Sequence, residues 1–517
     1  MGRAKTDSFI VELPLRVPPA QEQRLLTRLE AARQVYHACL GESLKRLDWL
    51  RQSKAYQAAR QMPTGQRDAP AAQARAQAFR QAHAAVGFRE YDLHAYAAQF
   101  NHCWIGEHLD SNTIQKLATR AFQAAQQYAF GRRGRPRFKG YNQMDTVEGK
   151  TNSSGIRWRD DQVEWLGLRL AALMDRADPV IAHGLRSRVK YVRLVRRKLN
   201  DRHRFYAQLV CEGRPYQKPQ NQVGKGTVGL DLGPSTIAVV AEREAFLAQF
   251  CAELEPRQQD IRRLQRRLDR QRRANNPSNY NPDGTIRRGP KVWQQSGRQR
   301  RGAAQLTERH RRQAAHRKSL HGQMVNQVLR MGNVIQTEKL SYRAFQRTFG
   351  RSVGRRAPGR FVEHLKRKAA SAGATVVEFP TRTTRLSQVC HQCGVVALKP
   401  LSQRWHRCDC GIVAQRDLYS AFLATCVEGE RLNAGRAATA WPGVDLLLQA
   451  ALSDIQPANG RPLPSSFGLA AGRRQSWSPV KAGVNAVEAQ DVVPSVALLD
   501  DRGELERDCR IARTPRL

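Results

Sequence analysis

The 517-residue chain is poor in acidic side chains and has no long apolar run. Its 45 aspartates and glutamates stand against 87 lysines and arginines, which gives a formal net charge of +42. No stretch stays apolar over the roughly 20 residues that a transmembrane helix needs. The N-terminal sequence MGRAKTDSF also lacks the apolar core of a signal peptide. We therefore expect a soluble cytoplasmic protein with no membrane partner.

The excess of positive charge predicts a polyanionic partner. Nucleic acid is the first candidate, because each phosphate that a side chain neutralises releases counterions and adds affinity. An anionic membrane surface is the alternative. The length suffices for two to four domains with a substantial core, and no internal repeat is evident.

Four of the ten cysteines cluster: Cys390, Cys393, Cys408 and Cys410. In a cytosolic chain such a cluster indicates a metal site more often than disulfides. Two close pairs across a short loop can close a tetrahedral zinc site, and a site with no open position is structural. The second pair has one intervening residue, not the usual two, so His391 or His406 could replace one cysteine.

Hydrophobic periodicity divides the first half of the chain. Residues 8–17 alternate like a strand, and apolar residues then recur at helical spacing between about 18 and 130. Strand patterns return between 155 and 217, with a hairpin formed by 189–197 and 204–212. We expect a β-domain that encloses the helical segment as an insertion.

Three segments carry most of the cationic side chains. The loop FGRRGRPRFKG at 130–140 presents cations beside Phe138, which suits phosphate contact and base stacking; a solvated linker is the alternative. Residues 252–274 and 293–332 predict helices whose charge is nearly all positive, so that an external anion would relieve their self-repulsion; a solvated charged helix is the alternative. The candidate nucleic-acid contacts are Arg132, Arg133, Arg135, Arg137, Lys139, Arg298, Arg309 and Arg312.

Three acidic residues lie beside apolar segments. Asp231 lies in the first strand of a predicted hairpin at 227–240, Glu338 near the end of a short strand at 333–341, and Asp417 at the start of an apolar helix. A buried carboxylate is costly unless a cation or partner compensates. At one sheet edge the three can hold two divalent cations, and magnesium prefers such oxygen ligands. Alternatively, each is a turn or cap residue.

The order of these pieces resembles the split RuvC-type nuclease of TnpB and the compact type V CRISPR effectors. The matching segments are GLDLGPSTIAVV, IQTEKLS, CHQCG…CDCG and QRDLYSAFLA, and the upstream RPRFKG resembles the loop that joins recognition helices to the wedge domain there. The resemblance covers roughly residues 8–428. It implies that Asp231, Glu338 and Asp417 are catalytic carboxylates that bind Mg²⁺, beside a structural Zn²⁺.

The fold that this resemblance implies is α/β with additional α and β domains. It is bilobed, with a split RNase H-like (RuvC) nuclease domain, an inserted zinc knuckle, a β-barrel wedge domain and a helical recognition lobe. The implied limits are 1–17 and 131–225 for the wedge, 18–130 for the recognition domain and 226–428 for the nuclease domain (basic helices at about 252–332, knuckle at about 384–412). For residues 429–517, outside the resemblance, the Pro-, Ser- and Gly-rich composition predicts a flexible C-terminal tail with one helical patch at 444–452.

The activity that the resemblance implies is RNA-guided, metal-dependent DNA cleavage in the prokaryotic cytosol, near the nucleoid, as in antiviral defence. A guide RNA would pair with a double-stranded DNA target beside a short flanking motif, with one or two protein copies per guide. Two alternatives remain: a guided binder that silences without cutting, and an unguided transposon-associated nuclease or DNA-binding protein. The family commonly has Asn two residues after the final Asp, where this chain has Tyr419.

Overall fold

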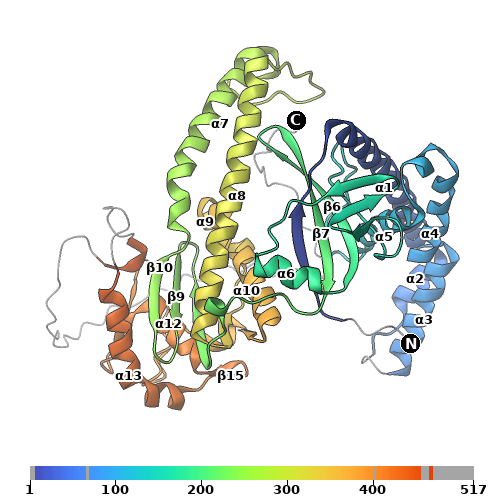
Figure 1. Ribbon diagram of the computed structural model, residues 1–517. Helices are drawn as coiled ribbons and strands as arrows, with labels where there is room; N and C mark the ends of the chain where they lie inside the picture. Colours follow the sequence, from blue (N-terminus) through green and yellow to red (C-terminus); the bar gives the residue numbers. More distant parts are fainter. Residues whose placement is uncertain (1–5, 66–68, 401, 456–464, 470–517) are drawn as a thin grey trace. The chain divides into compact units, whose positions relative to one another are not determined.

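The computed structural model describes residues 6–65, 69–400, 402–455 and 465–469 (Figure 1). None of the helices in these ranges is long and apolar enough to cross a bilayer. The predicted tail falls partly outside them, because 456–464 and 470–517 are not described.

The N-terminal part contains a helical segment inserted between strands, as the sequence predicts. Apolar residues at helical spacing form the long α1, whose buried side bears Leu25, Leu29 and Val35. The elements are β1 (Ser8–Pro14), α1 (Pro19–Gln52), α2 (Lys54–Gln61), α3 (Pro70–Ala85), α4 (Glu90–Ala98), the 3-10 turns η1 (Gln99–His102) and η2 (Trp104–Glu107), α5 (Ser111–Ala129), β2 (Thr146–Glu148), β3 (Arg157–Arg159), β4 (Gln162–Trp165), β5 (Leu168–Ala171), α6 (Pro179–Arg186), β6 (Val189–Leu199) and β7 (Arg202–Glu212).

The strands of this part form two open sheets. One is antiparallel with the order β1-β7-β6-β2, and the other has the order β3-β4-β5; a single bridge between Leu15 and Ala172 connects them. The predicted β-barrel is therefore wrong for the described residues. At the β1 edge, α6 packs closely on the strand, since a Cβ at Gly184 would lie 2.1 Å from Val11. At the β2 edge, the strand has only three residues and is too short to continue the pairing.

The C-terminal part is built around one mixed sheet. Its order is β10-β9-β8-β11-β12, in which β10, β9 and β8 are antiparallel neighbours while β8, β11 and β12 run parallel. The elements are the 3-10 turn η3 (Pro219–Asn221), β8 (Thr227–Leu232), β9 (Thr236–Val240), β10 (Ala245–Gln249), η4 (Ala252–Leu254), α7 (Glu255–Asn275), η5 (Pro277–Asn279), α8 (Gly297–Met331), β11 (Val334–Glu338), α9 (Tyr342–Arg356), α10 (Pro358–Ala372), β12 (Thr375–Phe379), α11 (Thr381–Thr384), β13 (Trp405–Arg407), β14 (Val413–Gln415), α12 (Arg416–Thr425), β15 (Val427–Glu428), β16 (Arg431–Leu432), α13 (Ala434–Ser453) and η7 (Ser465–Phe467).

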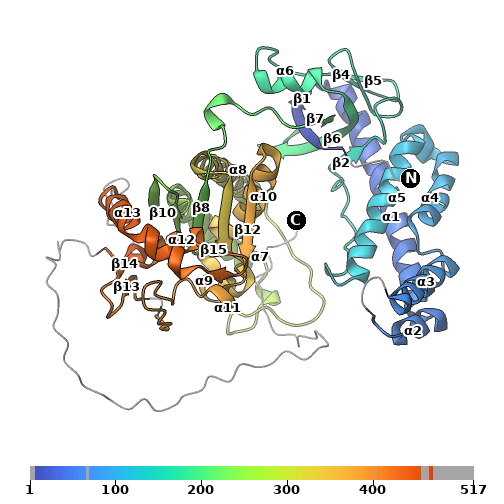
Figure 2. The ribbon, with the colours of Figure 1, turned by 90° about the horizontal axis from the view of Figure 1, so that it is seen from below.

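Both faces of this sheet are covered by helices (Figure 2). On one face, α8 and α10 bury Val325, Val328 and Phe361 against the strands. On the other, α12 packs on β8 and β9, and α13 packs on α12 and β10. The strands alternate between the two cores, which explains why β9 is buried at all five positions.

The two basic segments form a helical hairpin, in which α7 and α8 lie side by side (Figure 1). At its end the guanidinium of Arg272 lies 3.8 Å from the centre of the Trp293 ring, and the Tyr280 ring meets that tryptophan edge-on at 5.9 Å. The two predicted helices thus form one helical hairpin, and ring contacts hold the connection at its end.

Residues after 428 also contribute to the fold. Helix α13 is longer than the predicted patch at 444–452 and packs through Trp441 against Phe422 of α12. The predicted tail therefore begins too early: local composition at 429–455 is mixed, but long-range packing on the sheet still stabilises the helix.

A close approach between β8 and α12 gives a testable prediction. A Cβ at Gly229 would lie 1.8 Å from the carbonyl oxygen of Ala421, a backbone atom that cannot swing aside. We expect Gly229→Ala to destabilise the protein by about 3 kcal/mol or more, measured by chemical denaturation. The control Gly41→Ala, in α1 with open space around the new methyl group, should instead stabilise by about 1 kcal/mol; equal effects would contradict this packing.

Candidate active site and zinc knuckle

Asp231 is fixed by the short hairpin between β8 and β9. It pairs with Ala238, and the turn is closed by a hydrogen bond from the Gly233 N–H to the Thr236 carbonyl oxygen at 3.0 Å. The Ser352 hydroxyl of α9 donates to the Pro234 carbonyl oxygen at 2.6 Å. The turn that follows Asp231 is therefore held by one hydrogen bond within the hairpin and by another from α9.

Glu338 and Asp417 reach the same edge of the sheet from other segments. Because β11 runs parallel to β8, with Thr337 opposite Leu230, Glu338 leaves its strand at the edge where Asp231 lies. Asp417 lies in the first turn of α12, buried against β8. The sequence predicts this convergence, and the structure brings the three acids together.

Hydrogen bonds orient two of these carboxylates. The Thr236 hydroxyl donates to Asp417 Oδ2 at 3.2 Å, and the Thr384 hydroxyl donates to Glu338 Oε1 at 3.4 Å. The guanidinium Nε of Arg416 lies 3.7 Å from Asp417 Oδ1. Sequence patterns give no signal for Thr384, whereas Thr236 and Arg416 lie within the quoted segments GLDLGPSTIAVV and QRDLYSAFLA but have no predicted role.

The pKa of Asp231 responds to burial and to the two other acids. Burial raises the pKa of Asp231 well above its ordinary value, and the negative charges of Asp417 and Glu338 raise it further, against opposing effects of Arg416 and Arg404. Burial also raises the pKa of Glu338, although hydrogen bonds to Leu386 and Thr384 partly oppose it.

Because of these raised pKa values, the stability of the folded chain depends on pH and on bound cations. The folded chain binds these protons more tightly than the unfolded chain, so their contribution to stability is lost as pH rises above the ordinary carboxyl pKa. A divalent cation would remove the penalty, and oxygen donors fit magnesium. In the described part of the chain, however, only the cysteine cluster is a group of candidate ligands whose atoms all lie within 4.8 Å. Sharing one ion would require the three carboxylates to turn toward each other.

The four clustered cysteines form a compact site. Their sulfur atoms all lie within 4.8 Å, with Cys390 and Cys410 3.4 Å apart and Cys393 and Cys408 3.4 Å apart. With Zn–S bonds of about 2.3 Å, tetrahedral geometry places sulfur atoms roughly 3.8 Å apart. A hydrogen bond to the backbone at Val395 and a second to Cys408 lower the pKa of the Cys393 thiol to about 7, whereas burial raises the pKa of the Cys410 thiol to about 12, so that a zinc ion would have to displace the Cys410 proton. The set fits a structural zinc ion.

The two histidines considered as ligands have other partners. His391 Nδ1 lies 2.7 Å from the Tyr419 hydroxyl, and His406 Nδ1 lies 2.7 Å from Lys399 Nζ. Neither ring belongs to the compact cysteine group. The short spacing of the second pair therefore does not prevent all four cysteines from meeting.

Tyr419 points away from the carboxylates. Residues two apart on a helix project in directions about 200° apart, so Asp417 faces the sheet edge while the fully buried Tyr419 ring lies against His406, with ring centres 4.4 Å apart. The departure from the family pattern thus concerns contact with the knuckle, and leaves the three acids in place.

The candidate nucleic-acid contacts differ in whether their side chains already have a partner within the protein. Arg132, Arg133, Arg135, Arg137 and Arg298 are exposed and have no ion pair with any described residue. Arg309 donates to the Asp260 carbonyl oxygen at 3.1 Å, and Arg312 is paired with Glu308 at 2.8 Å. The first five therefore suit phosphate contact better than the last two.

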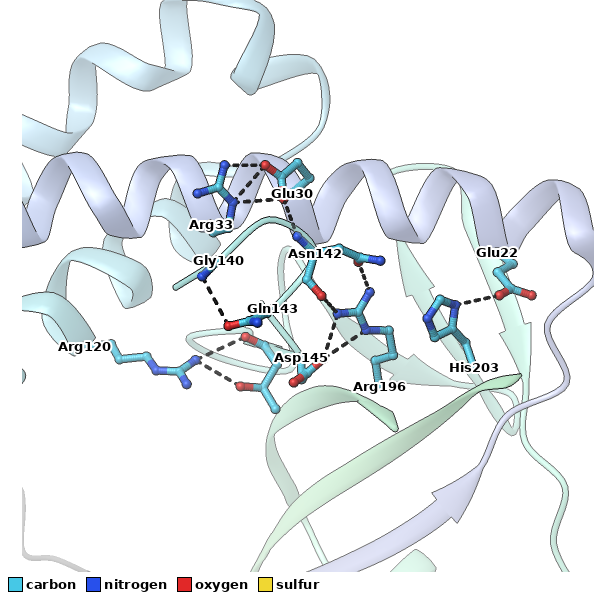
Figure 3. Close-up of polar contacts among 11 residues, drawn as sticks. Glu22, Glu30, Arg33, Arg120, Gly140, Asn142, Gln143, Asp145, Arg196 and His203 are labelled. Carbon is cyan, nitrogen blue, oxygen red and sulfur yellow. Dashed lines mark hydrogen bonds and ion pairs between the residues drawn. The ribbon is translucent and has the colours of Figure 1, made fainter. Parts of the chain in front are cut away.

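The basic loop is anchored at its C-terminal end. The Lys139 N–H donates to His37 Nε2 at 2.7 Å, and burial lowers the pKa of the Lys139 ammonium. Figure 3 shows the next residues held on both sides: the Asn142 N–H donates to Glu30 of α1, and its carbonyl oxygen accepts from Arg196 of β6 at 2.6 Å. Lys139 thus helps to anchor the loop whose arginines are exposed.

The cysteine geometry predicts one zinc ion per chain. We expect metal analysis to find it in the purified protein, and Cys408→Ser to lose it, because three thiolates bind zinc more weakly than four. The melting temperature should fall by roughly 5–10 °C if the site contributes a few kcal/mol. Cys103→Ser, at an isolated exposed cysteine, is the control; equal zinc content in both variants would contradict the assignment.

Comparison with known proteins identifies the segment around the knuckle. Residues 359–423 match the family model "Cas12f1-like, TNB domain". This match spans α10 to α12 and includes the four cysteines and Asp417. No curated protein matches the chain.

Two solved structures are similar in outline. One is a cryo-EM structure of a Cas12f1–sgRNA–target DNA complex, at 9% identity over 80% of this chain and 98% of that chain, with a TM-score of 0.40. The other is a cryo-EM structure of a CRISPR–Cas12f ternary complex, at 12% identity over 78% and 82%, with a TM-score of 0.26. The family model is the more specific match: the chain contains a Cas12f1-like TNB domain, and its predicted resemblance to the TnpB-like and compact type V CRISPR effector family is confirmed.

Proposed function

We propose that the protein is an RNA-guided DNA endonuclease in which Asp231, Glu338 and Asp417 are the catalytic carboxylates. The observation that carries this proposal is that three acids from segments far apart in sequence lie at one sheet edge, through the parallel pairing of β8 with β11 and the packing of α12 on β8. The sheet, with three antiparallel strands continued by two parallel ones, supports an RNase H-like (RuvC) domain. The Cas12f1-like TNB match at 359–423, which includes Asp417, supports the guided class.

The side chains around the cluster have distinct roles in this proposal. Asp231, on a strand buried on both faces, is the fixed central ligand, whereas Thr236 and Thr384 orient Asp417 and Glu338. Magnesium, when bound there, would supply a Lewis acid that activates water and stabilises the leaving oxygen. Arg416 and Arg404 place positive charge beside the carboxylates, where an incoming phosphate carries negative charge.

The guide RNA and the DNA target would be held mainly by phosphate contacts. Base pairing reads the target sequence, so the protein needs cations that follow a backbone and contacts to a short flanking motif. The exposed arginines of the 131–140 loop and the α7–α8 hairpin supply such cations. The number of protein copies per guide, one or two, stays a prediction.

The alternative of a guided binder that silences without cutting depended on Tyr419. Because that side chain points toward the knuckle, it neither replaces nor displaces a carboxylate. The ligand atoms of the three acids do not all lie within 4.8 Å of one another in the described chain, so the cleavage test below separates the silencing alternative from the nuclease.

The first test removes the central ligand. In a reaction with Mg²⁺, co-expressed RNA and a plasmid library with randomised flanks, we expect Asp231→Asn to lower cleavage at least about a hundredfold, since a metal ligand is removed. Target binding should be retained. Asp445→Asn, at a carboxylate on α13 that has no role in the proposed site, is the matched control. Full cleavage by Asp231→Asn would contradict the site, and cleavage without RNA would contradict the guided mechanism.

The second test concerns the loop arginines. We expect Arg132→Gln with Arg135→Gln to reduce the slope of log affinity against log salt by about 0.7–0.9 for each phosphate that the loop no longer neutralises, measured by filter binding with guide RNA. Arg89→Gln, at an exposed arginine already paired with Asp92, is the control. An unchanged slope in the double variant would show that the loop does not contact phosphate.

A further inference from the structure

The zinc knuckle continues directly into the helix that bears Asp417. Strand β13 pairs with β14, with Trp405 opposite Gln415, and the second cysteine pair lies in the turn between them. Helix α12 begins at the next residue, where the Arg416 N–H donates to the Arg404 carbonyl oxygen at 2.8 Å. The Gln415 side chain caps the helix by accepting from the Leu418 N–H at 2.8 Å. Closure of the cysteine site therefore restrains the start of α12.

Tyr419 makes a second connection between the knuckle and this helix. Its hydroxyl accepts from the His391 backbone N–H at 3.1 Å and pairs with His391 Nδ1 at 2.7 Å. His391 directly follows Cys390, the buried member of the first cysteine pair. Because Tyr419 and His391 are both buried, water cannot replace these hydrogen bonds if they are broken.

Aromatic packing holds the same turn of α12 in place. The Trp441 ring of α13 meets Tyr419 edge-on at 5.6 Å and lies 5.1 Å from His391, while the His406 ring lies 4.4 Å from Tyr419 at an interplanar angle of 31°. These rings fix the rotation of the helix as well as its distance from the knuckle. The Tyr419 hydroxyl adds a directional restraint that packing alone lacks.

Asp417 itself has only weak contacts. The described partners of its carboxylate are the Thr236 hydroxyl at 3.2 Å and the Arg416 Nε at 3.7 Å. Its position therefore depends on the anchoring of α12. A small rotation of the first turn, which the Tyr419 hydrogen bonds oppose, would move Asp417 relative to Asp231.

We propose that Tyr419 is a positioning residue, which transmits the closure of the four-cysteine zinc site to Asp417. This inference rests on the proposed function for its account of what Asp417 does there. The residue at which the chain departs from its family thereby links the zinc knuckle to the carboxylate cluster. Helix α13, from the segment after 428, completes the link through Trp441.

Tyr419→Phe tests this link, because it removes the hydroxyl and keeps the ring. In the full chain with guide RNA, we expect target affinity to stay within about twofold, while the cleavage rate falls about tenfold and the half-saturating Mg²⁺ concentration rises severalfold, as for residues that orient ligands. Tyr36→Phe is the matched control, since this buried tyrosine of α1 makes no hydrogen bond through its hydroxyl to any described residue. Unchanged rate and Mg²⁺ requirement in Tyr419→Phe would overturn the proposal.

A second measurement does not depend on cleavage. Amide hydrogen exchange over residues 416–425 should accelerate in Tyr419→Phe and after zinc chelation of the wild type, while Tyr419→Phe retains its zinc. Loss of zinc from Tyr419→Phe, or unchanged exchange, would overturn the positioning role. A wild type that fails to cut would contradict the proposed function instead, and the exchange experiment would still test the link.

Variants at His391 cover the case in which Tyr419→Phe does not fold. His391→Asn keeps an acceptor near the position of Nδ1 and should preserve slow exchange over 416–425, whereas His391→Ala should not. Equal exchange in the two variants would overturn the role of this hydrogen bond.

Discussion

Three like charges at one sheet edge are the constraint on which the C-terminal part of the molecule depends. Burial raises the pKa of Asp231, and the nearby charges of Asp417 and Glu338 raise it further. Such an arrangement persists only where the surrounding fold over-determines it. Here the fold does so through parallel strands that end together, a turn pinned by Ser352, and a helix packed on β8 at Gly229.

The contact at Gly229 explains how a helix can contribute the third carboxylate. Without a side chain at this position, the backbone of α12 approaches β8 more closely than any other residue would permit. The helix then places Asp417 beside the end of the strand, and its opposite side faces the knuckle. The ten-residue helix α12 thus bears Asp417 on one side and Tyr419, which contacts the cysteine knuckle, on the other. In the positioning role proposed for Tyr419, the stability of the knuckle therefore affects the geometry of the site.

The cysteine cluster could be predicted from local sequence, because closely spaced thiols are themselves the signal. Asp231, Glu338 and Asp417 carry only weak local signals; the order of the segments around them indicates one site, and their catalytic role stays a prediction. The open sheet of the N-terminal part, the packing of α13 and the orientation of Tyr419 depend on contacts between distant segments. Hydrophobic periodicity predicts that an element forms, but not which edge it covers. The hydrogen bond from Tyr419 to His391 joins residues 28 apart in sequence and has no local sequence pattern.

The net charge of +42 would attract a nucleic-acid substrate, whereas the acidic cluster would repel it. Exposed arginines attract a phosphate backbone over a wide surface, while three carboxylates at the sheet edge repel the phosphate that would have to approach them. In the proposed mechanism, a divalent cation would relieve the repulsion among the acids and would make the edge attractive to phosphate. The proposed metal dependence thus has an electrostatic reason: the acids that are costly to bury also repel a phosphate in the absence of a cation.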